Sequence, residues 1–248
     1  MKQLTILPGY DKNGTPEAFS SLTLTPGTLY AVVGHTGSGK SRFMKDLEQL
    51  ADGSSVTGRR ILIDGKPVPT NKRQELSSEL VAHLSQSMRF VLDLTVEEFL
   101  ALHIRCRRKL HLSPLPVLNM ANQITPEPIF LNQSLHQLSG GQSRALMIAD
   151  IAAICDSPVV LIDEIENAGI NKRAALNLLV SREKLVLAAT HDPHTALMAS
   201  ERIAMGNGAV LAVPRRTAEE ERLFVRLDRI YREQLTFQER LRKGVSLV

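Results

Sequence analysis

The sequence has two cysteines, no tryptophan and no apolar run near the roughly 18 to 20 residues that cross a membrane. Two cysteines in 248 residues exclude a disulfide-rich secreted scaffold and suit a reducing compartment. The N-terminus lacks the charged flank, apolar stretch and cleavage site of a secretory signal. Because 43% of the residues are apolar, the chain can bury a sizeable core. A cytoplasmic globular protein is therefore expected.

Positive charge is concentrated toward the C-terminal end. The formal net charge is +4, and residues 215–248 carry nine basic and six acidic side chains, so the remainder is nearly neutral. Aromatic side chains, on which unpaired bases stack, make up only 4%. A basic run at residues 105–109 is interpreted as a solvated helix end, in preference to a docking or nucleic-acid patch. Nucleic acid is therefore not expected as a partner.

Continuous apolar runs indicate a buried parallel sheet. Residues 158–162 and 184–189 show no polar alternation, as in strands that are covered on both faces. Their alternation with helical patterns predicts an α/β fold with helices on both faces of the sheet. Thr95 and Glu98 predict a capping box at the start of one helix. Other strands are expected at residues 3–7, 21–24, 28–33, 60–64 and 80–84, and helices at 42–51, 96–110 and 142–155.

A glycine-rich loop joins an expected strand to an expected helix. Residues 34–41 fit the phosphate-loop pattern G-x-x-x-x-G-K-[ST] completely. Its backbone N–H groups would surround phosphate oxygens, Lys40 would bridge the β- and γ-phosphates, and Ser41 would ligate Mg²⁺. The residues expected to contact the nucleotide here are Gly34, His35, Thr36, Gly37, Ser38, Gly39, Lys40 and Ser41.

Two further segments carry groups suited to nucleotide chemistry. The apolar strand at 159–162 ends in Asp163, expected to hold Mg²⁺, and Glu164, expected to polarise the attacking water. Strands ending in two acidic residues also occur without any catalytic role. The segment at 138–142 begins a helix, where hydroxyl, N–H groups and helix dipole form a second anion site. One nucleotide does not need both anion sites unless two chains share it. The expected contacts in this segment are Ser139, Gly140, Gly141 and Gln142.

The order of these motifs resembles the ATP-binding cassette (ABC) ATPases. The phosphate loop, a glutamine after a strand (Gln86), LSGGQ at 138–142, the acidic strand end and a histidine after a strand (His191) agree in order and spacing over residues 1–213. The resemblance implies a P-loop NTPase core of the ABC type, with a mostly parallel sheet and a small antiparallel β region. It also implies ATP and Mg²⁺ as ligands, and a head-to-tail dimer with a second copy that encloses two ATP molecules.

Roles for three more residues follow from the resemblance. Gln86 corresponds to the loop glutamine that contacts Mg²⁺ and the attacking water, and His191 to the switch histidine that contacts the γ-phosphate. With Glu164 they form the expected catalytic set, whereas Ser41, Gln86 and Asp163 form the expected metal set. Tyr10 lies where such proteins place an aromatic ring on adenine, although an ordinary strand aromatic is an equal alternative.

Some positions depart from the family pattern. The arginine that common transporter cassettes place three residues after the signature glutamine is absent, since Ala145 stands there and the arginine is Arg144. The segment after Glu164 lacks the usual Pro-Thr-Ser-Ala-Leu-Asp sequence, and Glu166 and Gly169 suggest an altered dimer contact. These differences indicate a protein outside the main transporter branches.

The domain organisation follows from the motif positions. The ATP-binding core is expected at 1–86 and 138–213, an inserted helical subdomain at 87–137 and a C-terminal helical tail at 214–248. A proline- and asparagine-rich connection is expected within the subdomain, which is too short for a long coiled-coil insertion. The tail reads as an amphipathic helix that packs on its own domain or on a second copy. Its apolar residues at helical spacing are Leu223, Leu227, Ile230, Leu235 and Leu241.

The predicted function is an ATP-hydrolysing ABC-type subunit that couples hydrolysis to a separate partner. The first interpretation is a transporter subunit that docks through its helical subdomain on a membrane-spanning protein. Such a subunit would be cytoplasmic and peripheral at the inner face of the cell membrane. The alternative is a soluble ABC ATPase that remodels or assembles a client protein complex.

Overall fold

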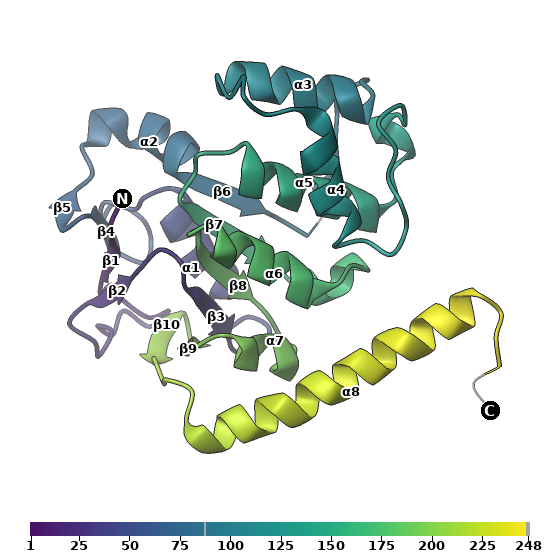
Figure 1. Ribbon diagram of the computed structural model, residues 1–248. Coiled ribbons are helices and arrows are strands. Elements are labelled where there is room, and N and C mark those ends of the chain that lie inside the picture. Colours follow the sequence, from purple (N-terminus) through teal and green to yellow (C-terminus); the bar gives the residue numbers. More distant parts are fainter. Residues whose placement is uncertain (87, 247–248) are drawn as a thin grey trace.

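The structure is a computed structural model that describes residues 1–86 and 88–246. Its centre is a six-stranded sheet in the order β10-β9-β3-β8-β7-β6, beside a four-stranded sheet in the order β2-β1-β4-β5 (Figure 1). The first sheet consists of β3 (Leu29–Val33), β6 (Val81–Leu84), β7 (Val159–Asp163), β8 (Leu185–Ala189), β9 (Glu201–Gly206) and β10 (Ala209–Ala212). The second consists of β1 (Leu4–Leu7), β2 (Leu22–Leu24), β4 (Arg60–Ile63) and β5 (Lys66–Pro67).

The pairing confirms the predicted fold class. Strands β6, β7, β8, β3 and β9 pair in parallel, and β10 adds an antiparallel edge. The smaller sheet pairs antiparallel throughout its described strands. Both sheets were expected from the sequence. Each strand that was predicted begins and ends within two residues of its predicted bounds.

The apolar strands are buried on both faces, as their composition predicts. In β7, Val160 and Ile162 pack in one hydrophobic cluster with the helices of one face. Val159 and Leu161 point the other way, into a second cluster that includes the antiparallel sheet and Phe43. Alternate residues of the same strand therefore serve two cores, which leaves no position for a polar side chain before the strand ends.

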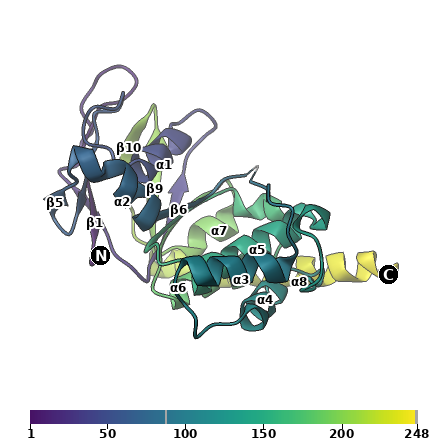
Figure 2. The ribbon, with the colours of Figure 1, turned by 90° about the horizontal axis from the view of Figure 1, so that it is seen from above.

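Helices cover both faces of the main sheet (Figures 1 and 2). Thr95 and Glu98 form the predicted capping box, although the helix that follows ends at Cys106, earlier than expected. The α-helices before the tail are α1 (Lys40–Glu48), α2 (Arg73–Leu80), α3 (Val96–Cys106), α4 (Pro114–Asn122), α5 (Gly140–Ala153), α6 (Lys172–Ser181) and α7 (Pro193–Met198). Short 3-10 turns are η1 (Thr70–Lys72), η2 (Leu135–Gln137) and η3 (Ile165–Ala168).

The expected irregular connection after α3 contains a helix, so that prediction was wrong in part. Pro114 is the first residue of α4 and Pro116 lies in the same first turn, where backbone N–H groups have no partner within a helix. Val117, Leu118 and Ala121 then bury one face of α4 in the main cluster. Proline at these positions starts a helix rather than breaking one.

The tail forms one long helix, α8 (Ala218–Arg242), which crosses the body beside α7 (Figure 1). Its contact face includes only part of the predicted apolar stripe: Leu227 and Leu235 are partly buried, whereas Leu223, Ile230 and Leu241 are about half exposed. On the same face as Leu227 and Leu235, the His194 ring stacks between Phe224 and Tyr231 at centroid distances of 5.5 and 4.6 Å. This helix therefore packs on its own chain through aromatic and polar contacts.

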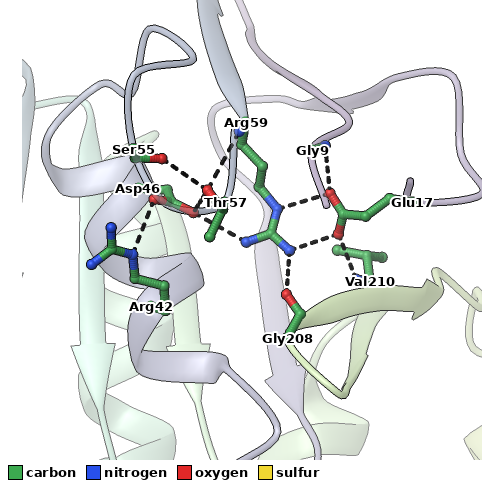
Figure 3. Close-up of polar contacts among 9 residues, drawn as sticks. All are labelled: Gly9, Glu17, Arg42, Asp46, Ser55, Thr57, Arg59, Gly208 and Val210. Carbon is green, nitrogen blue, oxygen red and sulfur yellow. Dashed lines mark hydrogen bonds and ion pairs between the residues drawn. The ribbon is translucent and has the colours of Figure 1, made fainter. Parts of the chain in front are cut away.

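A buried arginine ties the N-terminal loop to α1 and to the β9–β10 turn (Figure 3). Arg59 is 0% exposed and donates from Nε and Nη2 to the two Glu17 carboxylate oxygens, at 2.9 and 2.6 Å. It also donates to Asp46 Oδ2 of α1 at 3.1 Å and to the Gly208 carbonyl at 2.7 Å. Glu17 in turn accepts from the backbone N–H of Val210 at 2.7 Å. The guanidinium thus fixes three segments that surround the glycine-rich loop.

Removing this guanidinium is expected to destabilise the protein strongly. Arg59→Met leaves Glu17 and Asp46 as buried charges without their partner, which costs about 3 to 5 kcal/mol. Urea denaturation measures the loss against Arg60→Met, which removes the neighbouring exposed arginine and should change the stability by less than about 0.5 kcal/mol. Equal stabilities of the two variants would contradict the account of the network.

Candidate functional site

The glycine-rich loop lies between the end of β3 and the start of α1, as the sequence predicts. Gly39 has φ 107°, and a Cβ at this position would lie 2.8 Å from the Gly208 Cα. A Cβ at Gly34 would lie 2.5 Å from the Met205 carbonyl oxygen. Glycine is therefore required for close packing of the loop against the β9–β10 hairpin as well as for its own conformation.

Two lysines hold the loop in shape. Lys40 Nζ donates to the carbonyl oxygens of Gly34 at 2.6 Å and His35 at 3.2 Å. Lys12, from the N-terminal loop, donates to the Gly37 carbonyl at 2.7 Å. Burial lowers the pKa of the Lys40 ammonium, and the negative charge of Glu164 opposes this effect. With the N-terminus of α1 behind it, the loop offers a concave, electropositive seat for phosphate groups.

The structure brings Glu164 and His191 together, as expected for the catalytic set. Glu164 follows β7 in the left-handed region, at φ 47° and ψ 59°, and its N–H donates to the Ala189 carbonyl at 2.9 Å. His191 follows β8, and its Nε2 lies 3.6 Å from Glu164 Oε1. A non-glycine residue in this conformation is strained, which is characteristic of functional sites.

Asp163 has a partner that the sequence reasoning missed. His83, on the neighbouring strand β6, lies with Nε2 at 3.2 Å from Asp163 Oδ2 and Nδ1 at 3.1 Å from Glu48 Oε1. The hydrogen bond with Asp163 raises the pKa of His83, Glu48 adds to the effect, and burial opposes it. The available signal was positional, since His83 lies three residues before Gln86 on the strand beside the acidic end.

The oxygen ligands present suit a magnesium ion. Ser41 lies at the start of α1 with an exposed hydroxyl, and Asp163 offers a partly exposed carboxylate at the end of β7. In the part of the chain that the structure describes, no group of three or more His, Cys, Asp or Glu side chains forms a metal cage. Mg²⁺ is characteristically held by one or two protein oxygens together with substrate phosphates, so this donor set fits it.

Gln86 and Tyr10 occupy exposed positions near the site. Gln86 lies in the turn after β6, beside the strand that ends in Asp163, so it shares the sheet edge of the other site residues. Tyr10 is 51% exposed, with its backbone N–H donating to the Thr57 carbonyl at 2.7 Å and its ring against Gly58. Its contact with adenine remains a prediction.

The LSGGQ segment forms the N-terminus of α5, where Ser139 is the cap residue. Ser139 Oγ accepts from the Gln142 N–H at 3.2 Å and donates to Glu127 at 3.0 Å. The Gln142 side chain completes a capping box by accepting from the Ser139 N–H at 2.9 Å and donates to the Pro128 carbonyl at the same distance. Gln142 therefore shapes the helix start, and its contact with ATP remains a prediction.

The phosphate loop and the LSGGQ segment have different neighbours in the fold. A hollow of about 400 Å³ beside Gly34 is shared with the His191 segment. The lining residues are Val33, Gly34, His35, Thr36, Thr190, His191, Asp192, Pro193 and Ala196. Ser139 and Gln142 contact Glu127 and Pro128, whereas Gly34 and Gly39 pack against the β9–β10 hairpin.

The sequence is similar to proteins of one known family. The family model described as ABC transporter matches residues 19–167. An uncharacterized ABC transporter ATP-binding protein from Methanocaldococcus jannaschii is 45% identical over 248 residues, covering all of this chain and 95% of that protein. An energy-coupling factor transporter ATP-binding protein, EcfA1 of Mycoplasma genitalium, is 27% identical over 84% of this chain and 78% of its own length.

Solved structures agree with the fold. CbiO1 from Clostridium perfringens, part of the ABC transporter complex cbiONQ, matches with a TM-score of 0.64 and 22% identity over 94% of each chain. A dimeric ATP-binding cassette in a post-hydrolysis state, bound to ADP and Pi, matches with a TM-score of 0.61 and 22% identity, over 86% of this chain and 98% of that one. The site and fold define an ATP-binding cassette.

The chain belongs to the ABC transporter family, and it is an ATP-binding and ATP-hydrolysing subunit of that family. Among the helices of residues 1–86 and 88–246, none has the length and apolar character to cross a bilayer.

Gly39 and Gly37 of the phosphate loop both have a positive φ angle, but only Gly39 is packed against another segment. Gly39→Ala would force a methyl group against Gly208, whereas Gly37, at φ 78°, has open space around the corresponding position. We expect Gly39→Ala to weaken ATP binding at least about tenfold and Gly37→Ala to weaken it less. Titration calorimetry with ATP in EDTA measures both affinities without turnover. A Gly37→Ala effect as large as that of Gly39→Ala would contradict the contact with Gly208.

Proposed function

We propose that this chain is the nucleotide-binding subunit of a membrane transporter and that it works as a head-to-tail dimer. Each ATP would be held between the phosphate loop of one chain and the α5 N-terminus of the other. The observation that supports this arrangement is that the chain carries two anion-binding helix starts with different neighbours: Ser139 on α5 contacts Glu127, whereas the phosphate loop packs against the β9–β10 hairpin. A second copy supplies the missing half of each site.

Binding would rest on the phosphate loop. The N–H groups of residues 34–41 and the α1 N-terminus would hold the phosphate oxygens, and Lys40 would exchange its loop carbonyls for the β- and γ-phosphates. Tyr10 has an exposed ring beside Gly58 and would stack on the adenine. Ser139 with Gly140 and Gly141 of the other chain would close on the γ-phosphate.

Mg²⁺ fits the oxygen donors of Ser41, Asp163 and Gln86, and when bound it neutralises charge on the phosphates. His83 faces Asp163 from β6 and holds its carboxylate in place. The conversion of ATP into ADP and phosphate needs a base near the γ-phosphate and a group that senses this phosphate.

Glu164 would supply the base. Its carboxylate would accept a proton from the attacking water as the new bond to the γ-phosphorus forms and the bond to the leaving β-phosphate oxygen breaks. His191, with Nε2 at 3.6 Å from Glu164 Oε1, would contact the γ-phosphate and orient Glu164. The bond from the Glu164 N–H to the Ala189 carbonyl fixes the backbone beneath both side chains.

The partner would be a membrane-spanning subunit that places this chain at the inner face of the membrane. Apolar side chains are exposed just after Gln86, where Val91 is 90% exposed and Met88 and Leu92 are 44% and 46% exposed. An apolar hollow on α3 and the following loop, lined by Leu102 and Leu110 among others, lies in the same helical region. A membrane-spanning subunit bound to this apolar surface would transmit its movements through Gln86 to the ATP site.

Replacing the proposed base separates binding from chemistry. Glu164→Gln keeps the shape of the side chain but removes its basicity, so ATP turnover should fall by about 10² to 10⁴ while ATP remains bound. The expected product is an ATP-stabilised dimer on gel filtration.

The matched control is Glu79→Gln on α2. This variant changes an exposed carboxylate that is not among the residues assigned to the ATP site, so it should leave turnover unaltered. Full turnover in Glu164→Gln, or a chain that stays monomeric with bound ATP, would refute the proposed mechanism.

A further inference from the structure

Two charged side chains outside the recognised motifs contact the segments that carry the hydrolytic residues. Arg144 lies on α5, five residues beyond Ser139, and Glu166 lies in η3, two residues beyond Glu164. Arg144 is 7% exposed, and Glu166 is partly buried with its Oε2 atom inaccessible to solvent. Buried charges are costly to keep, so their contacts carry information about their role.

Arg144 links the ends of two neighbouring strands. Its Nη2 donates to the Leu84 carbonyl at 3.3 Å and to the Asp163 carbonyl. Leu84 ends β6, two residues before Gln86, and Asp163 ends β7 directly before Glu164. A single guanidinium from the signature helix therefore anchors the backbone from which both Gln86 and Glu164 project.

The shift of the arginine from the usual family position has a packing explanation. Ala145 is 0% exposed and lies within the apolar cluster between α5 and the sheet. An arginine there would bury its charge among apolar side chains. One position earlier on the helix, Arg144 instead reaches the polar carbonyl edge of the sheet.

Glu166 holds the backbone of the His191 segment. Its Oε1 accepts from the Thr190 hydroxyl at 2.8 Å and from the His191 N–H at 3.0 Å. The Thr190 oxygen also accepts from the Asp192 N–H at 3.0 Å, and Thr190 is 1% exposed. Through these contacts within one chain, Glu166 fixes the backbone from which the His191 ring projects.

The two side chains also interact electrostatically. Burial lowers the pKa of Arg144, while the negative charges of Asp163, Glu166 and Glu164 oppose that effect. Arg144 Nε and Glu166 Oε2 are both buried and make no hydrogen bond to the residues described. The positive charge of Arg144 therefore lies in the field of the acidic residues that follow β7.

We propose that Arg144 and Glu166 are positioning residues that couple the signature helix to Glu164 and His191. The inference rests on the roles given to those two residues under the proposed function. In the dimer, the α5 N-terminus binds one ATP, while Arg144 on the same helix sets Gln86 and Glu164 at the other. Closure on one nucleotide therefore adjusts the hydrolytic residues around its neighbour.

Two variants of Arg144 and two variants of Glu166 test the contacts of these side chains. Arg144→Met removes the donors while keeping the apolar stem, and Glu166→Ala removes the acceptor. We expect turnover to fall about 10- to 100-fold in both, with the ATP affinity within about threefold of the original. Arg144→Lys retains a donor and Glu166→Gln retains an acceptor oxygen, so each should recover a substantial part of the lost turnover.

A double variant distinguishes positioning from a structural role. If Glu166 acts through His191, then Glu166→Ala should lower turnover no further in a His191→Ala background. The matched control is Arg202→Met, which removes a partly buried arginine that pairs with Glu220 at the base of α8. It should lower the unfolding temperature without lowering turnover per folded molecule.

The results of these variants distinguish failure of the inference from failure of the proposed function. Normal turnover in Arg144→Met and Glu166→Ala, additive losses with His191→Ala, or losses that follow only the unfolding temperature would overturn the inference. Glu164→Gln is assayed in parallel: if it hydrolyses ATP normally, the proposed mechanism fails and this inference fails with it. If Glu164→Gln is inactive and the four variants are normal, only the inference fails.

Discussion

The parallel pairing of β3, β8, β7 and β6 is the constraint on which the site depends. Parallel strands end at the same edge, so the segments after them are neighbours whatever their distance in sequence. The phosphate loop follows β3, His191 follows β8, Glu164 follows β7 and Gln86 follows β6. The register is fixed by apolar residues that alternate between two cores, so a slip by one residue would put each side chain into the wrong core and shift the strand-end groups relative to one another.

Local patterns were sufficient to predict most of this framework. Strands buried on both faces are recognisable because they tolerate no polar residue, and the capping box at Thr95 because its two partners are three residues apart. The placement of the phosphate loop, Glu164 and His191 at one edge followed from the apolar runs that precede them. The family resemblance assigned roles to these residues, and the geometry then placed Glu164 beside His191.

The features that escaped prediction arise from contacts between distant segments. Arg59 is one of two adjacent arginines, and only the fold shows that it meets Glu17 and Asp46 while Arg60 remains exposed. The tail was expected to pack by an apolar stripe, but only Leu227 and Leu235 of that stripe lie on the face where Phe224 and Tyr231 stack on His194. Helix α2 carries no buried residue and so gives no amphipathic signal. Arg144 and Glu166 were recognised as departures, whereas their contacts with strand-end carbonyls and the His191 segment required the structure.

The central claim is that one chain contains two incomplete halves of an ATP site. Complementation between two inactive variants tests it directly, by mixing Lys40→Ala chains, which lack the phosphate-loop lysine, with Ser139→Arg chains, which lack a usable helix start. Each variant alone should be inactive. Random pairing makes half of the dimers mixed, each with one intact site, so the mixture should recover up to about a quarter of the original ATP turnover, and less where coupling between the two sites slows the intact one. A mixture as inactive as its components, or a Ser139→Arg chain that is active alone, would contradict the shared site.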